Sequence, residues 1–347
     1  MQVTPQRQSY QAQTSFKGLR SKDARALFAL DLDGTLLKGT DEEIKKVFEL
    51  AKKANAIVTY ATGQTKKEFF QKQQKYAQKG INIPTPNYFV SNNGQFIYKN
   101  IDGELVEDIN WRKILKEKTS FDREIVVAAM QKLGQSTKYK YSPKKITELE
   151  NFKHPQLGGI DIRKKEDPHF WNSKISYYEW NPSEHMVEYF VAHDVDIPAL
   201  KIDIKDSLAT KNITPKFIYH EYNKEIMDAC PVSILRQSRP LREDENGKMK
   251  VLFICPADKA DGVKYLGQKL NISENEILSA GNDSNDYSLA DLSKTTGAFF
   301  VCVGNAVHSI LEHAKKLNSD TIIFAKSHGS AGIAEGIETI MARFGTN

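Results

Sequence analysis

The 347-residue chain has little cysteine and no long apolar run. No stretch approaches the ~20 consecutive apolar residues of a membrane-spanning helix, which argues against a membrane-embedded protein. The three cysteines, Cys230, Cys255 and Cys302, lie far apart and form no CxxC pair. This spacing indicates neither a disulfide framework nor a zinc site, and it fits a reducing compartment. The eight histidines form no HxxxH or HxH pair, so no zinc is expected.

Acidic residues are absent from the first 22 positions, which carry Arg7, Lys17, Arg20 and Lys22. Such a leader is typical either of a disordered tail or of a targeting segment. It has no apolar stretch of about 7–15 residues, so an ordinary secretory signal is not expected. We therefore expect a cytoplasmic protein, with export or import through the leader as the alternative. The net charge of +5 is too small to indicate nucleic acid and suits a small anion equally well.

Apolar runs alternate with helical patterns in the first hundred residues. Continuous runs at 27–30, 56–61 and 88–91 are typical of parallel strands that are buried on both faces. Helical spacing over 41–54 and about 65–79 separates them. This rhythm predicts a parallel sheet with crossover helices. The carboxyl ends of its strands lie at one edge, where ligands bind in such sheets.

The alternation of apolar runs and helical patterns is interrupted over 100–255 and resumes near Pro256. The middle block is richer in lysine and aromatic residues, with strand patterns at 175–180 and 216–220 and a charged loop over 236–250. A helix beginning near Asp258 then precedes further expected elements: strands at 277–280, 298–303 and 321–324, and helices near 305–316 and 331–343. The predicted organisation is a leader over 1–26, an α/β core formed by 27–99 and 256–347, and an inserted α+β domain over 100–255.

Two carboxylates follow the first predicted strand, in Asp31-Leu32-Asp33-Gly34-Thr35. In an extended chain, residues i and i+2 point the same way, so Asp31 and Asp33 would share one small space. An ordinary Asx-type turn is the alternative, because Asp and Gly are both good turn formers.

Four segments, in order, resemble the motifs of the haloacid dehalogenase superfamily of phosphohydrolases. They are 31–37 (Asp-Leu-Asp-Gly-Thr-Leu-Leu), Thr62-Gly63, Lys259 within Pro-Ala-Asp-Lys, and 281–286. Each is a weak signal alone, but all four stand in the family's order, at strand ends or helix starts. The resemblance implies a Rossmann-like, doubly wound parallel-sheet core.

The inserted block lies between the second and third of these segments. Its position and length resemble the type IIB cap of Cof-like and sucrose-phosphate-phosphatase-like members. The run from Ser91 to Tyr98 resembles the Asn-Gly segment that leads into that cap, and Lys174 lies in a segment that resembles a cap strand. Gly304-Asn305-Ala306 resembles a late family feature.

The resemblance implies a Mg²⁺-dependent phosphatase acting through an aspartyl-phosphate. Asp31 would be the nucleophile, and Asp33 would donate and later accept the proton. Thr62 would hydrogen-bond a phosphoryl oxygen, and Lys259 would neutralise charge. The implied substrate-binding residues are Gly63, Gln64, Asn93, Lys174 and Asn285, and the implied metal-binding residues are Asp31, Asp33, Asn282, Asp283 and Asp286.

The chain departs from the family pattern at two places. Asn282 stands where the fourth motif usually has an acidic residue, and Asp283 would supply the carboxylate if the loop shifts by one residue. Gln64 stands where many relatives have Arg or Ser. We expect a small phosphorylated metabolite, most of all a sugar phosphate, as the substrate of a monomer or homodimer without nucleic-acid or membrane partners. The alternatives are a catalytically weak scaffold with a binding or regulatory role, and an exported effector phosphatase.

Overall fold

The structure, a computed structural model, describes residues 26–134, 141–142, 175–183, 185–191, 195–222 and 249–344. The chain separates into two compact units. One comprises residues up to 108, 259–282 and from 286 onward, and the other comprises 109–258 and 283–285. Lys174, most of the predicted leader and most of the charged segment 236–250 lie outside the described residues. Within the described residues, no helix is both long enough and apolar enough to cross a membrane.

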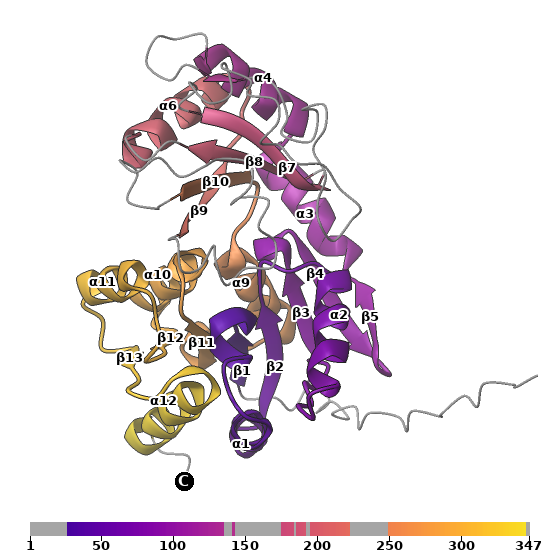
Figure 1. The fold of residues 1–347 in the computed structure, drawn as a ribbon, viewed down its shortest axis with the longest axis vertical. Helices are drawn as coiled ribbons and strands as arrows, with labels where there is room; N and C mark the ends of the chain where they lie inside the picture. The colour runs from indigo at the N-terminus through magenta and orange to yellow at the C-terminus, as the bar shows by residue number, and fades with distance from the viewer. Residues whose placement is uncertain are drawn as a thin grey trace, which may run out of the picture. The chain divides into compact units, whose positions relative to one another are not determined.

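An eight-stranded sheet forms the centre of the first unit, in the order β13-β12-β11-β1-β2-β3-β4-β5 (Figure 1). Its strands are β1 (Ala26–Leu30), β2 (Ala56–Ala61), β3 (Tyr88–Ser91), β4 (Phe96–Ile101), β5 (Glu104–Glu107), β11 (Ile277–Gly281), β12 (Phe299–Cys302) and β13 (Ile322–Phe324). Neighbours from β13 to β3 are parallel, and β3-β4 and β4-β5 are antiparallel. In the register of β1, Leu27 lies opposite both Ile57 and Ile277. The first and last parts of the chain therefore build one sheet.

Helices cover both faces of this sheet: α1 (Asp41–Lys53), α2 (Lys66–Ala77), α9 (Lys259–Leu270), α10 (Tyr287–Thr296), α11 (His308–Leu317) and α12 (Gly329–Phe344). On one face, Ile44 of α1, Phe69 of α2 and Ile333 of α12 join a single apolar cluster. On the other face, Gly262 of α9 packs so closely that a Cβ there would lie 2.7 Å from a methyl group of Val90. The predicted doubly wound α/β core is confirmed.

Local sequence fixes where the first two helices begin. Thr40 and Glu43 form a capping box at the start of α1, and Thr65 and Glu68 form one at the start of α2. In each, the threonine hydroxyl accepts the backbone N–H of the glutamate, whose carboxylate accepts the threonine N–H in return. These caps place both helices directly after the loops at the sheet's carboxyl edge.

The second unit contains a five-stranded sheet in the order β6-β7-β8-β10-β9. Its elements are β6 (Tyr141–Ser142), β7 (Ile175–Ser183), β8 (Met186–Val191), β9 (Lys216–Tyr222), β10 (Met249–Cys255), α3 (Ile109–Thr119), α4 (Arg123–Gly134) and α6 (Ile197–Ala209). Val126 of α4, Leu200 of α6 and Tyr189 of β8 belong to one buried cluster. This unit is α+β, as expected for the inserted block.

Two features differ from the sequence interpretation. The antiparallel strands β4 and β5 were not expected, and they extend the core sheet to Glu107, beyond the boundary predicted at residue 99. Only Ile97 and Leu105 are buried in these outer strands, so they lack the continuous buried apolar run that marks β1. The predicted loop over 236–250 is also wrong at its end, because β10 already begins at Met249.

Candidate active site

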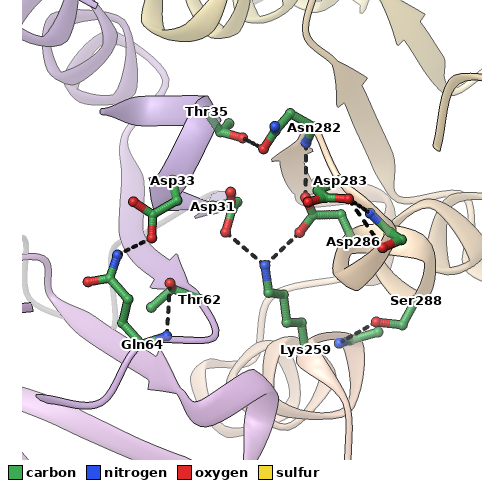
Figure 2. A network of polar contacts seen from close by, with 12 residues as sticks. Asp31, Asp33, Thr35, Thr62, Gln64, Lys259, Asn282, Asp283, Asp286 and Ser288 are labelled. Atoms are coloured by element: carbon green, nitrogen blue, oxygen red, sulfur yellow. Dashed lines mark hydrogen bonds and ion pairs between the residues drawn. The ribbon is translucent and has the colours of Figure 1, made fainter. Parts of the chain in front are cut away.

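Three charged side chains from distant parts of the chain meet at the carboxyl edge of the core sheet. Asp31 directly follows β1, Asp286 follows β11, and Lys259 is the first residue of α9. The Lys259 ammonium lies 2.8 Å from Oδ1 of Asp31 and 2.7 Å from Oδ1 of Asp286 (Figure 2). Asp31 is 3% exposed, and the other two residues are fully buried. They form a charged group that is shielded from water.

The charges of this group do not balance. Burial raises the pKa of Asp31 from its ordinary 3.8 to about 7, an effect that Lys259 opposes and the Asp286 carboxylate reinforces. Although burial disfavours its charge, the two carboxylates hold the pKa of Lys259 above its ordinary value. Lys259 therefore stays charged, and the group has an excess negative charge whenever Asp31 is ionised. Such an environment favours an additional cation.

Asp33 lies two residues after Asp31 in a different environment, with its side chain 57% exposed. Its Oδ2 accepts a 2.5 Å hydrogen bond from Nε2 of Gln64, and its Oδ1 forms an ion pair with Lys72 of α2. The two carboxylates are still close enough for the charge of Asp33 to raise the pKa of Asp31. The pair thus consists of one buried and one accessible carboxylate, both on the same turn.

The loop after β2 places Thr62 and Gln64 beside this turn. Thr62 is buried, and its hydroxyl accepts the backbone N–H of Gln64 at 3.2 Å. From the turn after β3, Asn92 N–H donates to the Gln64 carbonyl at 3.0 Å, and Asn93 N–H donates to the Thr62 carbonyl at 2.9 Å. Asn92, Asn93 and Gly94 have φ values of 48°, 55° and 99°, a left-handed conformation that Asn and Gly tolerate best.

Gly63, between Thr62 and Gln64, is exposed. A Cβ at this position would lie 3.3 Å from the side chain of the buried Asn93. The structure therefore brings together three of the predicted substrate-binding residues, Gly63, Gln64 and Asn93.

The loop after β11 meets the Asp31 turn through Asn282. Its Oδ1 accepts a 2.8 Å hydrogen bond from the Thr35 hydroxyl, and its backbone N–H donates to Oδ2 of Asp286 at 2.9 Å. A Cβ on Gly34, which has φ of 75°, would lie 2.4 Å from Nδ2 of Asn282. Only glycine permits this close approach.

The neighbouring acidic residue, Asp283, bonds locally. Its carboxylate accepts hydrogen bonds from the backbone N–H and the hydroxyl of Ser284. Asn285 lies in the 3₁₀ turn Ser284–Asp286 that leads into α10. Of the two predicted metal-binding alternatives, Asn282 contacts the Asp31 turn through its side-chain oxygen.

Several residues that sequence reasoning did not assign also hold this turn. Asn305 bridges two loops: its Nδ2 donates to the Gly34 carbonyl, and its Oδ1 accepts from the Gly329 N–H, both at 2.7 Å. The Ser330 hydroxyl donates to the Leu36 carbonyl at 2.6 Å. Asn305 stands in Gly304-Asn305-Ala306, which resembles a late feature of the family. Thr35 lies in the first motif segment but had no assigned role. No local pattern distinguishes Ser330 or Lys72, and only the tertiary structure reveals their contacts.

The oxygen atoms at this edge fit a magnesium ion. Within the described residues, no three Asp, Glu, His or Cys side chains form a group that could hold a metal by themselves. The site instead offers the carboxylate of Asp31 and the neutral amide oxygen of Asn282. Mg²⁺ prefers oxygen ligands and keeps several of its waters, so a site with few protein ligands suits it. It would also offset the excess negative charge.

Comparisons with known proteins concern the family and the fold of the chain. Residues 28–337 match the family model for haloacid dehalogenase-like hydrolases. A search of curated proteins finds no match. The solved sucrose-phosphatase of Synechocystis sp. PCC6803, in complex with sucrose and phosphate, is 18% identical with a TM-score of 0.56, and the match covers 91% of this chain and 98% of that one.

A haloacid dehalogenase-like hydrolase from Bacillus subtilis is 16% identical with a TM-score of 0.49, over 92% of this chain and 93% of its own. At such identities the likeness to solved structures concerns the fold alone. The family model nevertheless covers most of the sequence, including all four motif segments. The chain therefore belongs to the haloacid dehalogenase-like hydrolase family.

Proposed function

We propose that the protein is a Mg²⁺-dependent phosphatase that hydrolyses a small phosphorylated metabolite, namely a sugar phosphate. The observation that carries this proposal is the buried group of Asp31, Lys259 and Asp286 at the carboxyl ends of β1 and β11. A buried carboxylate beside a fixed ammonium suits nucleophilic attack on a phosphate. The fold shared with a sucrose-phosphatase supports the sugar phosphate class.

Two displacements would complete the reaction. Lys259 holds Oδ1 of Asp31, so Oδ2 is the oxygen that would bond to phosphorus. As that bond forms, the bond from phosphorus to the leaving oxygen breaks, and the leaving oxygen takes the proton of Asp33. A water then attacks phosphorus and passes a proton to Asp33. The bond between phosphorus and Oδ2 of Asp31 breaks, so that phosphate leaves and the Asp31 carboxylate is restored.

The surrounding residues would bind and orient the phosphate. Thr62 would donate its hydroxyl to a phosphoryl oxygen, and Lys259 would stabilise the charge there. Gly63, Gln64 and Asn93 line the adjacent turns, and Asn285 and Lys174 stay further predicted substrate contacts. Preorganised donors of this kind stabilise the charge that develops in the transition state.

Asp31, the Asp33 carbonyl and Asn282 would hold the metal ion. Asp286 would support the metal site through its charge and through Lys259, because its two oxygens already accept bonds from Lys259 and from the Asn282 N–H. Asp283 is the alternative ligand. When bound, Mg²⁺ supplies positive charge that offsets the repulsion between carboxylate and phosphate.

We also propose that the inserted domain predicted over 100–255 is a cap that selects the leaving group. Its α+β sheet and the fold shared with a sucrose-phosphatase over nearly the whole chain support this role. A small metabolite is the proposed partner, bound by a monomer or homodimer.

One observation favours a second candidate, a catalytically weak binding protein. Asn282 carries no charge where the family pattern has an acidic residue, and its amide oxygen already accepts a bond from Thr35. Metal binding would then be weaker, and turnover would be slow or absent.

Phosphate release distinguishes the two candidates. Wild type, Asp31→Asn and the surface control Asp320→Asn should be incubated with p-nitrophenyl phosphate and a panel of sugar phosphates, with Mg²⁺ and with chelator. We expect turnover in wild type and the control only with Mg²⁺, and loss of turnover in Asp31→Asn. Equal turnover by Asp31→Asn would contradict the mechanism, and a wild type that binds but does not hydrolyse sugar phosphates would favour the binding protein.

A further inference from the structure

We infer that Lys72 and Gln64 are positioning residues that hold Asp33 for proton transfer to the leaving group. This inference rests on the proposed function. Both residues contact the same carboxylate, one at each oxygen: Gln64 Nε2 donates to Oδ2, and Lys72 Nζ donates to Oδ1. An exposed aspartate ordinarily samples several rotamers. Two donors at opposite oxygens restrict Asp33 to one of them.

The two donors come from rigid elements. The backbone of Gln64 is bonded on both sides, by its N–H to the Thr62 hydroxyl and by its carbonyl to the Asn92 N–H. Lys72 lies within α2, whose start is fixed by the capping box of Thr65 and Glu68. One continuous segment, from the end of β2 into α2, therefore supplies both contacts to the turn after β1 (Figure 2 shows the Gln64 contact).

The amide of Gln64 points its donor at Asp33 and leaves its own acceptor oxygen without a hydrogen bond in the part of the chain that the structure describes. Gln64 is 8% exposed, and its Oε1 is buried without a hydrogen-bond partner among the described residues. Rotating the amide would turn Oε1 toward the Asp33 carboxylate, where two oxygens would repel each other. The side chain thus keeps its donor on Asp33 although its own acceptor stays unsatisfied, which indicates that Asp33 determines its orientation.

The chemistry of the first displacement explains why donors are useful at this place. When Asp33 gives its proton to the leaving oxygen, negative charge develops on its carboxylate. Donors that already point at both oxygens stabilise that charge without reorganising. Gln64 supplies direction but no charge, and Lys72 supplies the positive charge. The contribution of Gln64 and Lys72 to the rate of the first displacement should therefore be largest for leaving groups that most need protonation.

Leaving groups of different basicity provide the test. A sugar phosphate releases a strongly basic alkoxide and needs the proton, whereas p-nitrophenyl phosphate releases a weakly basic phenolate and hardly needs it. We would measure the first phosphoryl transfer in single turnovers for wild type, Lys72→Met, Lys72→Arg and Gln64→Leu. Lys75→Met is the matched control, because Lys75 is an exposed lysine on the same helix.

For Lys72→Met we expect a loss on the order of tenfold or more with the sugar phosphate and at most a small loss with p-nitrophenyl phosphate. Gln64→Leu should show the same dependence on leaving group, Lys72→Arg should recover most of the rate, and Lys75→Met should match wild type. In an Asp33→Asn background, Lys72→Met should cause no further loss.

Equal losses with both substrates would indicate a merely structural role and overturn the inference. A faster Lys72→Met would also overturn it, because the ion pair would then restrain Asp33 in an unproductive position. If wild type hydrolyses neither substrate, the proposed function itself fails, and the inference fails with it. Failure of the inference alone is recognised by an active wild type whose substrate ratio Lys72→Met does not change.

Discussion

The hydroxyl of Thr35 donates a 2.8 Å hydrogen bond to the side-chain oxygen of Asn282, which lies 247 positions further along the chain. This bond joins the turns that follow β1 and β11. Gly34, beside it, leaves the space that Asn282 occupies. The geometry around Asp31 thus depends on a contact between the two ends of a discontinuous core.

Two glycines allow the steric demand at this contact to be measured. Gly34 and Gly80 have nearly the same φ, 75° and 76°, but a Cβ on Gly34 would meet Asn282, whereas one on Gly80 would meet nothing within 4 Å. Gly80→Ala should cost about 1 kcal/mol for the left-handed backbone alone. Gly34→Ala should cost more and should also abolish most phosphatase activity. Chemical denaturation and turnover check this, and equal effects of the two variants would contradict it.

Lys259→Met should strongly destabilise the protein. It leaves Asp31 and Asp286 buried without their shared cation, and breaking a buried ion pair in this way typically costs about 3–5 kcal/mol. The free energy of unfolding, measured by denaturant titration at pH 8 in chelator, checks this. Lys264→Met on the same helix is the control and should change stability by less than about 0.5 kcal/mol. If Lys259→Met lowered the free energy of unfolding as little as Lys264→Met, water would have to reach the carboxylates of Asp31 and Asp286.

Asp31→Asn should change how stability depends on pH. The pKa of Asp31 is about 7 in the folded protein and 3.8 in a free chain, so the folded state keeps a proton that the unfolded chain releases. The stability linked to this proton is present at acid pH and is lost as pH rises through about 7. Asp31→Asn does not ionise, so its Tm relative to wild type should rise between pH 5 and pH 8, to a gain of roughly a few degrees.

Calorimetry in chelator, with Asp320→Asn as the control, measures this difference. A Tm difference that does not vary with pH, or a less stable Asp31→Asn at pH 8, would show that Asp31 is already fully ionised in the neutral folded protein.

Asn282→Asp should increase the response to magnesium. A carboxylate at this position adds negative charge beside Asp31 and Asp286, so in chelator the variant should melt below wild type. With Mg²⁺ the added ligand charge becomes favourable, and both the Tm gain and kcat should exceed those of wild type. Thermal shift across a Mg²⁺ titration checks this, with Asn110→Asp on the exposed start of α3 as the control. An unchanged magnesium dependence would place the metal elsewhere than at Asn282.

The parts of the fold that local sequence determines were predictable. The buried strands β1, β2 and β3 have continuous apolar runs, and the carboxylates of Asp31 and Asp33 follow the first of them. The family motifs then predicted that Lys259 and Asp286 would lie near Asp31, which the structure shows.

Contacts that depend on side-chain direction were not predictable. Lys72 is one of several lysines on a helix surface, and nothing in its neighbourhood indicates that it reaches Asp33. The side chain of Asn305 bonds to backbone atoms of Gly34 and Gly329. Because nearly every residue has the same backbone groups, the sequence does not indicate which of them are its partners. The strands β4 and β5 were not predictable because edge strands with a single buried residue each resemble an ordinary polar segment.

The position of β1 between β2 and β11 also has a consequence for synthesis on the ribosome. Residues 277–281, which form β11, are made long after 26–30. The edge of β1 that pairs with β11 therefore lacks its partner while the whole of 109–258 is translated. The inserted unit is complete before the core can close, and we expect it to fold first. A nascent chain halted after residue 258 would expose that open edge, the kind of surface that favours intermolecular pairing unless a chaperone covers it.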